Sequence, residues 1–294
     1  MKAATSTSTA FAVATLGIAV FSSMDAVMKG LSLAIGAYNA LLWRSLAGTL
    51  IAGALFLLTR TPWPPRAVLR VHLVRGAVSA VMAILFFWGL ARVPMAQAVA
   101  LTFVAPLIAL LLAGLLLKEH IGRSAILASC IALAGVLVIF AGQARGRFGP
   151  EATLGSLAIL GSAICYAWNI ILMRQQAMVA RPVEIAFFQS AIVAVLFLLA
   201  APLFAGVPDA GHAPMLVLAA LLATASLMLL SWAYARAQAS YLAPSEYTGF
   251  VWASLLGWIV FSERLSLYTL AGAALIIGGC ILSARAAPPP ETSL

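Results

Sequence analysis

Long apolar runs recur along the whole chain, and each is about as long as a helix that crosses a membrane. Such a helix needs roughly 20 mostly apolar residues, and the chain offers ten runs of that size, separated by short charged, Pro- and Gly-containing stretches. The predicted spans are 10–32, 38–59, 71–91, 95–117, 122–141, 152–173, 183–204, 214–235, 240–261 and 266–284. Each is predicted to be a helix, because backbone in lipid must satisfy its own hydrogen bonds and the runs are too long for barrel strands.

Charged residues are too scarce for a water-soluble protein of this length. They make up 9% of the 294 residues, whereas soluble domains carry about 25%. The sequence therefore predicts an all-α integral membrane protein. The formal net charge of +9 does not indicate a nucleic-acid partner, because the basic residues lie singly at the ends of apolar runs and form no patch interleaved with aromatic residues.

Motifs for catalysis or metal binding are missing from the sequence. The three cysteines form no CxxC pair, the three histidines are scattered, and neither HExxH nor GxxxxGK[ST] occurs. We therefore expect no enzyme activity, no cofactor, no metal site and no ATP drive from this chain. A membrane-embedded enzyme stays a distant alternative, and it would change its substrate chemically instead of moving it.

Lys and Arg residues concentrate in alternate loops. Eleven of the 17 fall on the side of the N-terminus and five on the other side. Because loops rich in Lys and Arg stay in the cytoplasm, both termini are expected to be cytoplasmic.

The second half of the chain repeats the first. At an offset of 144 residues, Trp88 meets Trp232 and Arg92 meets Arg236, and Glu119 and Gly135 meet Glu263 and Gly279. Each half holds five spans, and an odd number turns the second copy upside down. This inverted-repeat architecture is typical of secondary transporters, whose substrate site lies near the midplane between the repeats. The expected units are a cytoplasmic tail 1–9, a first repeat 10–146, a second, inverted repeat 147–286 and a cytoplasmic tail 287–294.

Two segments resemble the ten-helix EamA-type carriers of the drug/metabolite transporter superfamily. They are GLARVPMAQAVALTFVAPLIALLLAGLLLKEHIGRSAILASCIALAGVLVI in the first half and YLAPSEYTGFVWASLLGWIVFSERLSLYTLAGAALIIGG in the second. Each is a proline-bearing helix that runs to a terminal Glu, followed by a Gly-containing helix. The resemblance covers almost the whole chain and implies a basket of helices around a central cavity. Among members, the chain is most similar to bacterial inner-membrane exporters of aromatic and other neutral amino acids.

Polar stripes mark the spans expected to line that cavity, because residues three, four, seven and eleven apart share one face of a helix. The candidate substrate-binding residues on these stripes are Ser79, Tyr166, Asn169, Tyr241, Ser245, Thr248 and Trp252. Their hydroxyls, amide and rings suit a small zwitterion or amphipathic metabolite. The alternative is that these side chains only bond across helix interfaces or lie in the interfacial aromatic belt.

Charged residues inside the spans are the candidates for gating or ion coupling, since each is costly in lipid unless it is paired or hydrated. They are Asp25, Lys29, Arg44, Arg75 and Glu246. Asp25, Lys29 and Arg44 are expected to form one ion cluster at the outer side, either structural or a gate.

Three other glutamates are predicted to have structural roles. Glu184 is expected to pair with Arg174 at the inner side, and Glu119 and Glu263 to end their helices. Glu246 heads a face of small residues on its span, within expected reach of Arg75 or Arg236.

Together these features predict a secondary transporter of the inner membrane that exports small amino-acid-like metabolites, such as aromatic or other neutral amino acids, by alternating access. The alternative is an uptake carrier for a nucleoside-like, sulfonium or vitamin metabolite. Proton coupling through Glu246 or Asp25 and facilitated diffusion fit equally well. Besides the lipid bilayer and the small-molecule substrate, no obligate partner is evident.

Overall fold

The computed structural model describes the chain except for residues 1–6, 106, 109–122, 146–148, 238 and 287–294. The described residues form helices and no strand. These helices are α1 (Thr7–Ile35), α2 (Ala37–Leu58), α3 (Arg66–Leu90), α4 (Met95–Thr102), α6 (Arg123–Arg145), α7 (Pro150–Val179), α8 (Pro182–Phe204), the short 3₁₀ helix η1 (Ala210–His212), α9 (Ala213–Tyr234), α10 (Ala239–Phe261) and α11 (Leu267–Ala286).

Six stretches of the described helices are long and apolar enough to cross a membrane. They are Ser8–Ile35, Ala37–Leu58, Arg66–Leu90, Pro150–Val179, Pro182–Phe204 and Ala210–Tyr234. The all-helical membrane fold predicted from the sequence is therefore confirmed. Described helix also falls within each of the other four predicted ranges, but those helices do not meet the same criterion over their described residues, so ten spans stay a prediction.

Pro and Gly set several of the points at which the chain reverses. Gly36 separates α1 from α2 with a φ of 79°, a left-handed conformation that a residue with a Cβ rarely adopts. Pro150 and Pro182 stand in the first turns of α7 and α8, where the missing N–H leaves no helical hydrogen bond unmade. These short connections make consecutive helices run in opposite directions.

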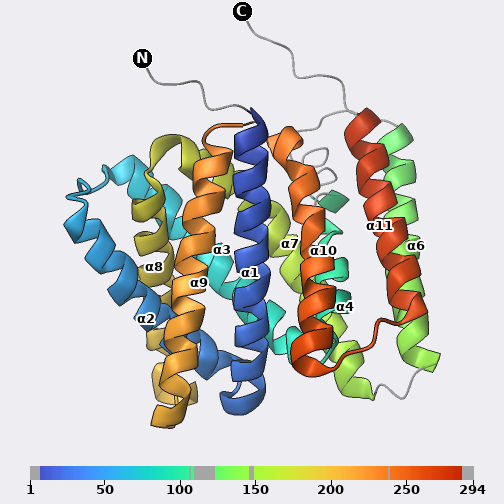
Figure 1. Ribbon diagram of the computed structural model, residues 1–294, viewed down its shortest axis with the longest axis horizontal. Coiled ribbons are helices and arrows are strands. Elements are labelled where there is room, and N and C mark those ends of the chain that lie inside the picture. Colours follow the sequence, from blue (N-terminus) through green and yellow to red (C-terminus); the bar gives the residue numbers. More distant parts are fainter. Residues whose placement is uncertain (1–6, 106, 109–122, 146–148, 238, 287–294) are drawn as a thin grey trace, which may run out of the picture.

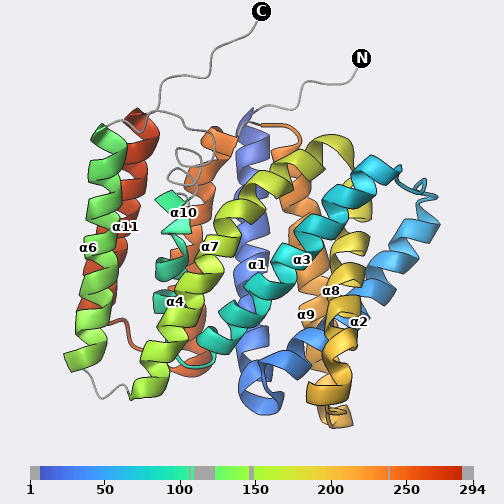
Figure 2. The ribbon, with the colours of Figure 1, turned by 180° about the vertical axis from the view of Figure 1, so that it is seen from behind.

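The helices stand side by side in two layers (Figures 1 and 2). The pair α6 and α11 forms one edge and the pair α2 and α8 the other, with α1, α9 and α10 on the face toward the viewer in Figure 1 and α3 and α7 behind them. We call the end of the bundle at which α1 begins the near end and the opposite end the far end. α7 begins at the far end and α11 finishes at the near end.

Glycines allow the closest approaches between helices. A Cβ on Gly89 of α3 would lie 2.5 Å from the carbonyl oxygen of Gly155 in α7, and one on Gly135 of α6 would lie 2.6 Å from that of Gly272 in α11. Small residues at such interfaces let backbones pack closely, which is a main source of helix association in lipid. The pairs α3/α7 and α6/α11 are thus fixed by backbone proximity.

Two Arg–Trp pairs have the same local geometry at opposite ends. The Arg92 guanidinium lies 3.6 Å from the Trp88 ring centre and donates to the Trp88 carbonyl at 2.9 Å, just beyond α3 at the far end. Arg236 lies 4.0 Å from the Trp232 ring and donates to the Trp232 carbonyl at 3.1 Å, just beyond α9 at the near end. These are the residue pairs that the sequence repeat matches.

Candidate functional site

Two of the predicted polar stripes meet between α3 and α7. Arg75 Nε donates to Asn169 Oδ1 at 3.0 Å, and Asn169 Nδ2 donates to Ser79 Oγ at 2.9 Å. Arg75, Ser79 and Asn169 are all buried. The amide therefore holds a buried guanidinium and a buried hydroxyl together, and satisfies a polar group on each side.

The network continues from Arg75 toward the near end. Arg75 Nη1 donates to Gln176 Oε1, the Gln176 amide nitrogen bonds to His72 Nδ1, and His72 Nε2 lies 2.9 Å from Glu184 Oε1. Gln176 and His72 are buried and were missed from the sequence. Their spacing could have identified them. His72 lies three residues before Arg75 and Gln176 seven residues after Asn169, so each shares a helix face with a predicted residue.

Glu184 was expected to pair with Arg174. Its described partner is His72, whose ring also stacks on Phe188 with centroids 4.6 Å apart. The side chain of Arg174 lies outside the described residues. The near-end network is therefore built from Glu184 and a histidine that sequence reasoning had left unassigned.

Glu246 is held by two phenols, so the expectation of an arginine partner is wrong. Tyr166 OH donates to Oε2 at 3.1 Å and Tyr234 OH to Oε1 at 2.5 Å. Arg236 is turned onto Trp232 and Arg75 onto the α7 amides. The face below Glu246 does pack closely, since a Cβ on Gly249 would be in van der Waals contact with α1 and α4 and Ala253 is fully buried. This packing turns the carboxylate toward α7 and α9.

The other residues of the predicted α10 stripe are engaged within their own helix or in packing. Ser245 Oγ donates to the Leu242 carbonyl at 2.7 Å and Thr248 Oγ1 to the Ser245 carbonyl at 2.6 Å. Trp252 packs on an apolar cluster contributed by α1, α7, α9 and α10, and its buried indole N–H has no hydrogen-bond partner. The side chain of Tyr241 lies outside the described residues.

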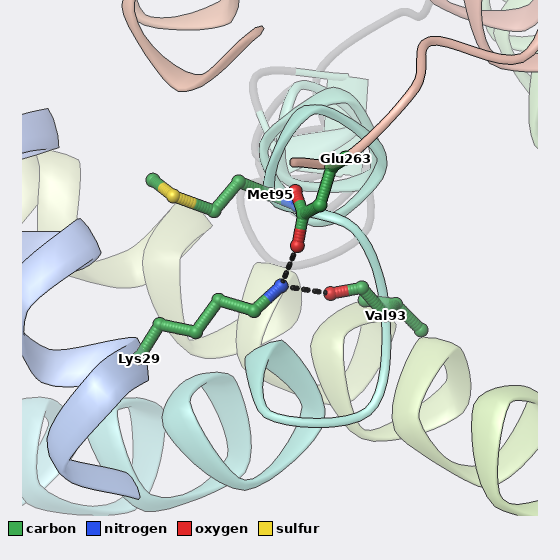
Figure 3. A network of polar contacts seen from close by, with 4 residues as sticks. All are labelled: Lys29, Val93, Met95 and Glu263. Atoms are coloured by element: carbon green, nitrogen blue, oxygen red, sulfur yellow. Dashed lines mark hydrogen bonds and ion pairs between the residues drawn. The ribbon is translucent and has the colours of Figure 1, made fainter. Parts of the chain in front are cut away.

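Lys29 pairs with Glu263 at the far end, which corrects the expected cluster with Asp25. Its ammonium donates to Glu263 Oε1 and, at 2.6 Å, to the Val93 carbonyl, and Glu263 Oε2 accepts from the Met95 N–H at 2.7 Å (Figure 3). The long lysine side chain reaches past its own helix to a site that offers a carboxylate and a carbonyl together. Glu263 thus ties α1 to the loops before α4 and α11.

Asp25 and Arg44 remain together deeper in the bundle. Asp25 on α1 and Arg44 on α2 interact electrostatically, and Arg44 Nη1 lies 3.7 Å from Met24 Sδ. Asp25 Oδ1 and Arg44 Nε are buried without a hydrogen-bond partner. The predicted three-residue cluster is therefore split: Lys29 forms an ion pair with Glu263, while Asp25 and Arg44 interact with each other at longer range.

Ser79 contacts Asn169 and Ser245 contacts Thr248, and none of the predicted binding residues lines either of two hollows among the described residues. A groove of about 530 Å³ opens at the near end, lined by α1, α9 and the ends of α2 and α8, including Thr61, Arg181 and Trp232. A cavity of about 30 Å³, room for roughly one water, lies beside Glu263 and Gln97. Neither is lined by Tyr166, Asn169 or Trp252.

Comparisons with known proteins agree on one family. The sequence model of the EamA-like transporter family matches residues 8–141 and 153–285. The chain is 29% identical over 278 residues to the pseudopaline exporter CntI of Pseudomonas aeruginosa, covering 92% of this chain and 94% of that protein. It is 29% identical over 234 residues to a riboflavin transporter of Rhizobium johnstonii, covering 77% of this chain and 72% of that one.

A solved structure supports the same fold. It is similar with a TM-score of 0.63 and 21% sequence identity, and the match covers 95% of this chain and 99% of the other. At this identity the likeness concerns the fold alone. The match extends over both halves of the chain.

Proposed function

This chain belongs to the EamA-like transporter family of the drug/metabolite transporter superfamily, and we propose that it is a secondary transporter that moves small amino-acid-like metabolites by alternating access. Membership makes it a membrane transporter. The substrate class, direction and mechanism are the proposed part.

The observation that carries the proposed substrate class is the polar network buried inside an apolar bundle. Arg75, Asn169, Tyr166 and Glu246 join α3, α7 and α10 through hydrogen bonds, although polar and ionisable groups inside a membrane are expensive and are kept where function needs them. Together they offer a cation, an anion, an amide and a phenol. This set matches the groups of an amino acid, and rings such as Trp252 would pack an apolar side chain.

Two inverted five-helix repeats would supply the alternating motion. Supporting them, the family model matches each half of the chain, α1 and α7 begin at opposite ends, and the two Arg–Trp pairs repeat one geometry at opposite ends. The packing partners support the same relation. A two-fold axis that exchanges α1 with α7 would also exchange α9 with α3, and α1 packs against α9 just as α7 packs against α3. Each half would then be a unit that rocks against the other.

We assign export as the direction and the bacterial inner membrane as the location, with both termini in the cytoplasm. An exporter is among the similar proteins, and the near end carries the excess of Lys and Arg expected of a cytoplasmic face. The riboflavin transporter among the relatives favours a second candidate, a carrier for a vitamin-like metabolite that lacks an amino-acid group.

Reconstituted protein would test the proposed function. Proteoliposomes loaded with unlabelled L-phenylalanine are expected to accumulate radiolabelled L-phenylalanine by exchange, with chemically unchanged product. Riboflavin flux without amino-acid flux would favour the second candidate, and a chemically altered substrate would contradict transport. Protein-free liposomes and liposomes holding the Asn169→Ala variant are the controls.

A further inference from the structure

The buried charged side chains of the described bundle differ in what they contact. Lys29 pairs with Glu263, and Glu184 contacts His72. Asp25 and Arg44 interact electrostatically with each other. Arg75 and Glu246 take part in no ion pair recorded among the described residues, and their recorded hydrogen-bond partners are neutral side chains. A buried charge is costly unless it is paired, so these two groups need a reason to be there.

The neutral partners of Arg75 hold it from one side. Its Nε and Nη1 donate to the amide oxygens of Asn169 and Gln176. The carboxylate of Glu184 lies beyond Gln176 and His72 in the hydrogen-bond chain and contacts the histidine. The guanidinium is therefore oriented by amides without being neutralised in contact, which leaves its charge for an anionic group to meet.

Glu246 is arranged in the complementary way. Both of its oxygens accept hydrogen bonds from phenols, Tyr166 on α7 and Tyr234 on α9. Two neutral donors satisfy and orient the carboxyl group, but they bring no positive charge. The Glu246 carboxyl group is therefore positioned to bind a cationic hydrogen-bond donor.

Helix α7 brings the two groups together. On α7, Tyr166 contacts Glu246 and Asn169 contacts Arg75. Tyr166 and Asn169 lie three positions apart, about 4.5 Å along the helix. Tyr166 is also close enough to Arg75 for the two to interact electrostatically. A ligand lying across one turn of α7 would reach both charges.

We propose that Arg75 and Glu246 form the two poles of a zwitterion site, in which Arg75 binds the α-carboxylate and Glu246 the α-ammonium group of an amino acid. The assignment rests on the proposed function and specifies which end of the substrate each residue recognises. The amides of Asn169 and Gln176 and the phenols of Tyr166 and Tyr234 position these poles. A neutral vitamin would form an ion pair with neither residue.

Ligand analogues test this on the unmodified protein, so that no variant needs to fold. The probes are L-phenylalanine, phenethylamine, which lacks the carboxylate, and 3-phenylpropanoate, which lacks the ammonium group. Losing one partner of a buried charge pair weakens affinity by about 30-fold or more, so we expect both analogues to compete that much more weakly in the exchange assay. Equal competition by either analogue would overturn the zwitterion site while leaving transport intact.

Variants then assign each pole. Asn169→Asp is nearly isosteric and supplies a fixed carboxylate to Arg75, so it should keep the fold and abolish the preference for L-phenylalanine over phenethylamine. Glu246→Gln should abolish the preference over 3-phenylpropanoate. Arg92→Gln and Glu151→Gln, from an exposed pair at the far end, are the matched controls and should keep both preferences. Retained preferences in Asn169→Asp or Glu246→Gln contradict the assignment, and absence of any amino-acid flux in the unmodified protein contradicts the proposed function instead.

Discussion

At the scale of single residues, Tyr166 connects groups that come from three helices. Its hydroxyl donates to Glu246 on α10, its helix α7 also carries Asn169, and Asn169 binds Arg75 on α3. Tyr166 itself packs against the small buried cluster of Ala105, Ala163 and Ala167. One phenol therefore combines a contact to a buried carboxylate with a place in the apolar packing.

Tyr166→Phe should lower the free energy of unfolding by about 1.5–3 kcal/mol, because it removes a hydrogen bond to a charged group and leaves the ring in place. Tyr38→Phe is the matched control. It deletes a hydroxyl bonded to the Phe197 carbonyl, a neutral acceptor, so its loss should be about 0.5–1.5 kcal/mol. Reversible unfolding in mixed micelles measures both, and equal losses would show that Glu246 is not ionised there.

The residues of this network were predictable to the extent that they lie on one helix face. Arg75, Ser79 and Asn169 were found by their spacing. Tyr234 was missed because it lies at the end of its apolar run, where a ring is expected in the interfacial belt. The Lys29–Glu263 pair joins residues 234 positions apart, and only the folded loop before α11 brings them together.

At the scale of helices, α3 and α7 are held together where glycines face each other. The Gly89→Ala methyl would lie 2.5 Å from the Gly155 carbonyl oxygen and 2.6 Å from Ile159 Cγ1. Neither the backbone oxygen nor the packed isoleucine can give way freely. We expect a loss of about 1–3 kcal/mol of stability, typical of overpacking.

Gly161→Ala is the matched control on the same interface. Its methyl would lie 3.6 Å from Leu85 Cδ1, an ordinary contact, and alanine favours the helix over glycine by about 1 kcal/mol. The control should therefore be as stable as the unmodified protein or slightly more so. Thermal unfolding of both variants checks this, and equal stability would mean that α3 and α7 pack less closely at Gly89.

Helix positions were more predictable than helix ends. Apolar runs marked where α1, α7 and α8 lie, because lipid demands continuous apolar length. The ends of α1 and α7 reach beyond the runs, from 10–32 to Thr7–Ile35 and from 152–173 to Pro150–Val179. Helical hydrogen bonds can continue into the polar residues that flank an apolar run. Hydropathy does not mark these residues as helical, so the predicted ends fall short.

At the scale of the whole molecule, the uneven distribution of Lys and Arg predicts which loops face which side of the membrane. Arg236 and Arg264 are both exposed, at the near and the far end. In a variant without Cys130, Cys165 and Cys280, we expect a cysteine at Arg264 to react with a membrane-impermeant maleimide in intact cells. One at Arg236 should react only after the cells are broken, and the reverse pattern would contradict cytoplasmic termini.

The Lys29–Glu263 pair acts at this same scale, because it joins α1 of the first half to the end of α10 in the second half (Figure 3). Any rocking of the halves that opens the far end must break it. Glu263→Gln keeps an oxygen for the Met95 N–H but removes the charge that Lys29 needs. We therefore expect the far end to open more often.

A cysteine at Ala253 reports this opening, since Ala253 is fully buried and lines the small cavity beside Glu263. In detergent, Glu263→Gln should raise its maleimide labelling rate by about tenfold, the equivalent of 1.4 kcal/mol taken from the closed state. Arg264→Gln removes an exposed neighbouring charge and should leave the rate unchanged. If Glu263→Gln also leaves it unchanged, the ion pair only fastens the loops, and closure of the far end depends on helix packing alone.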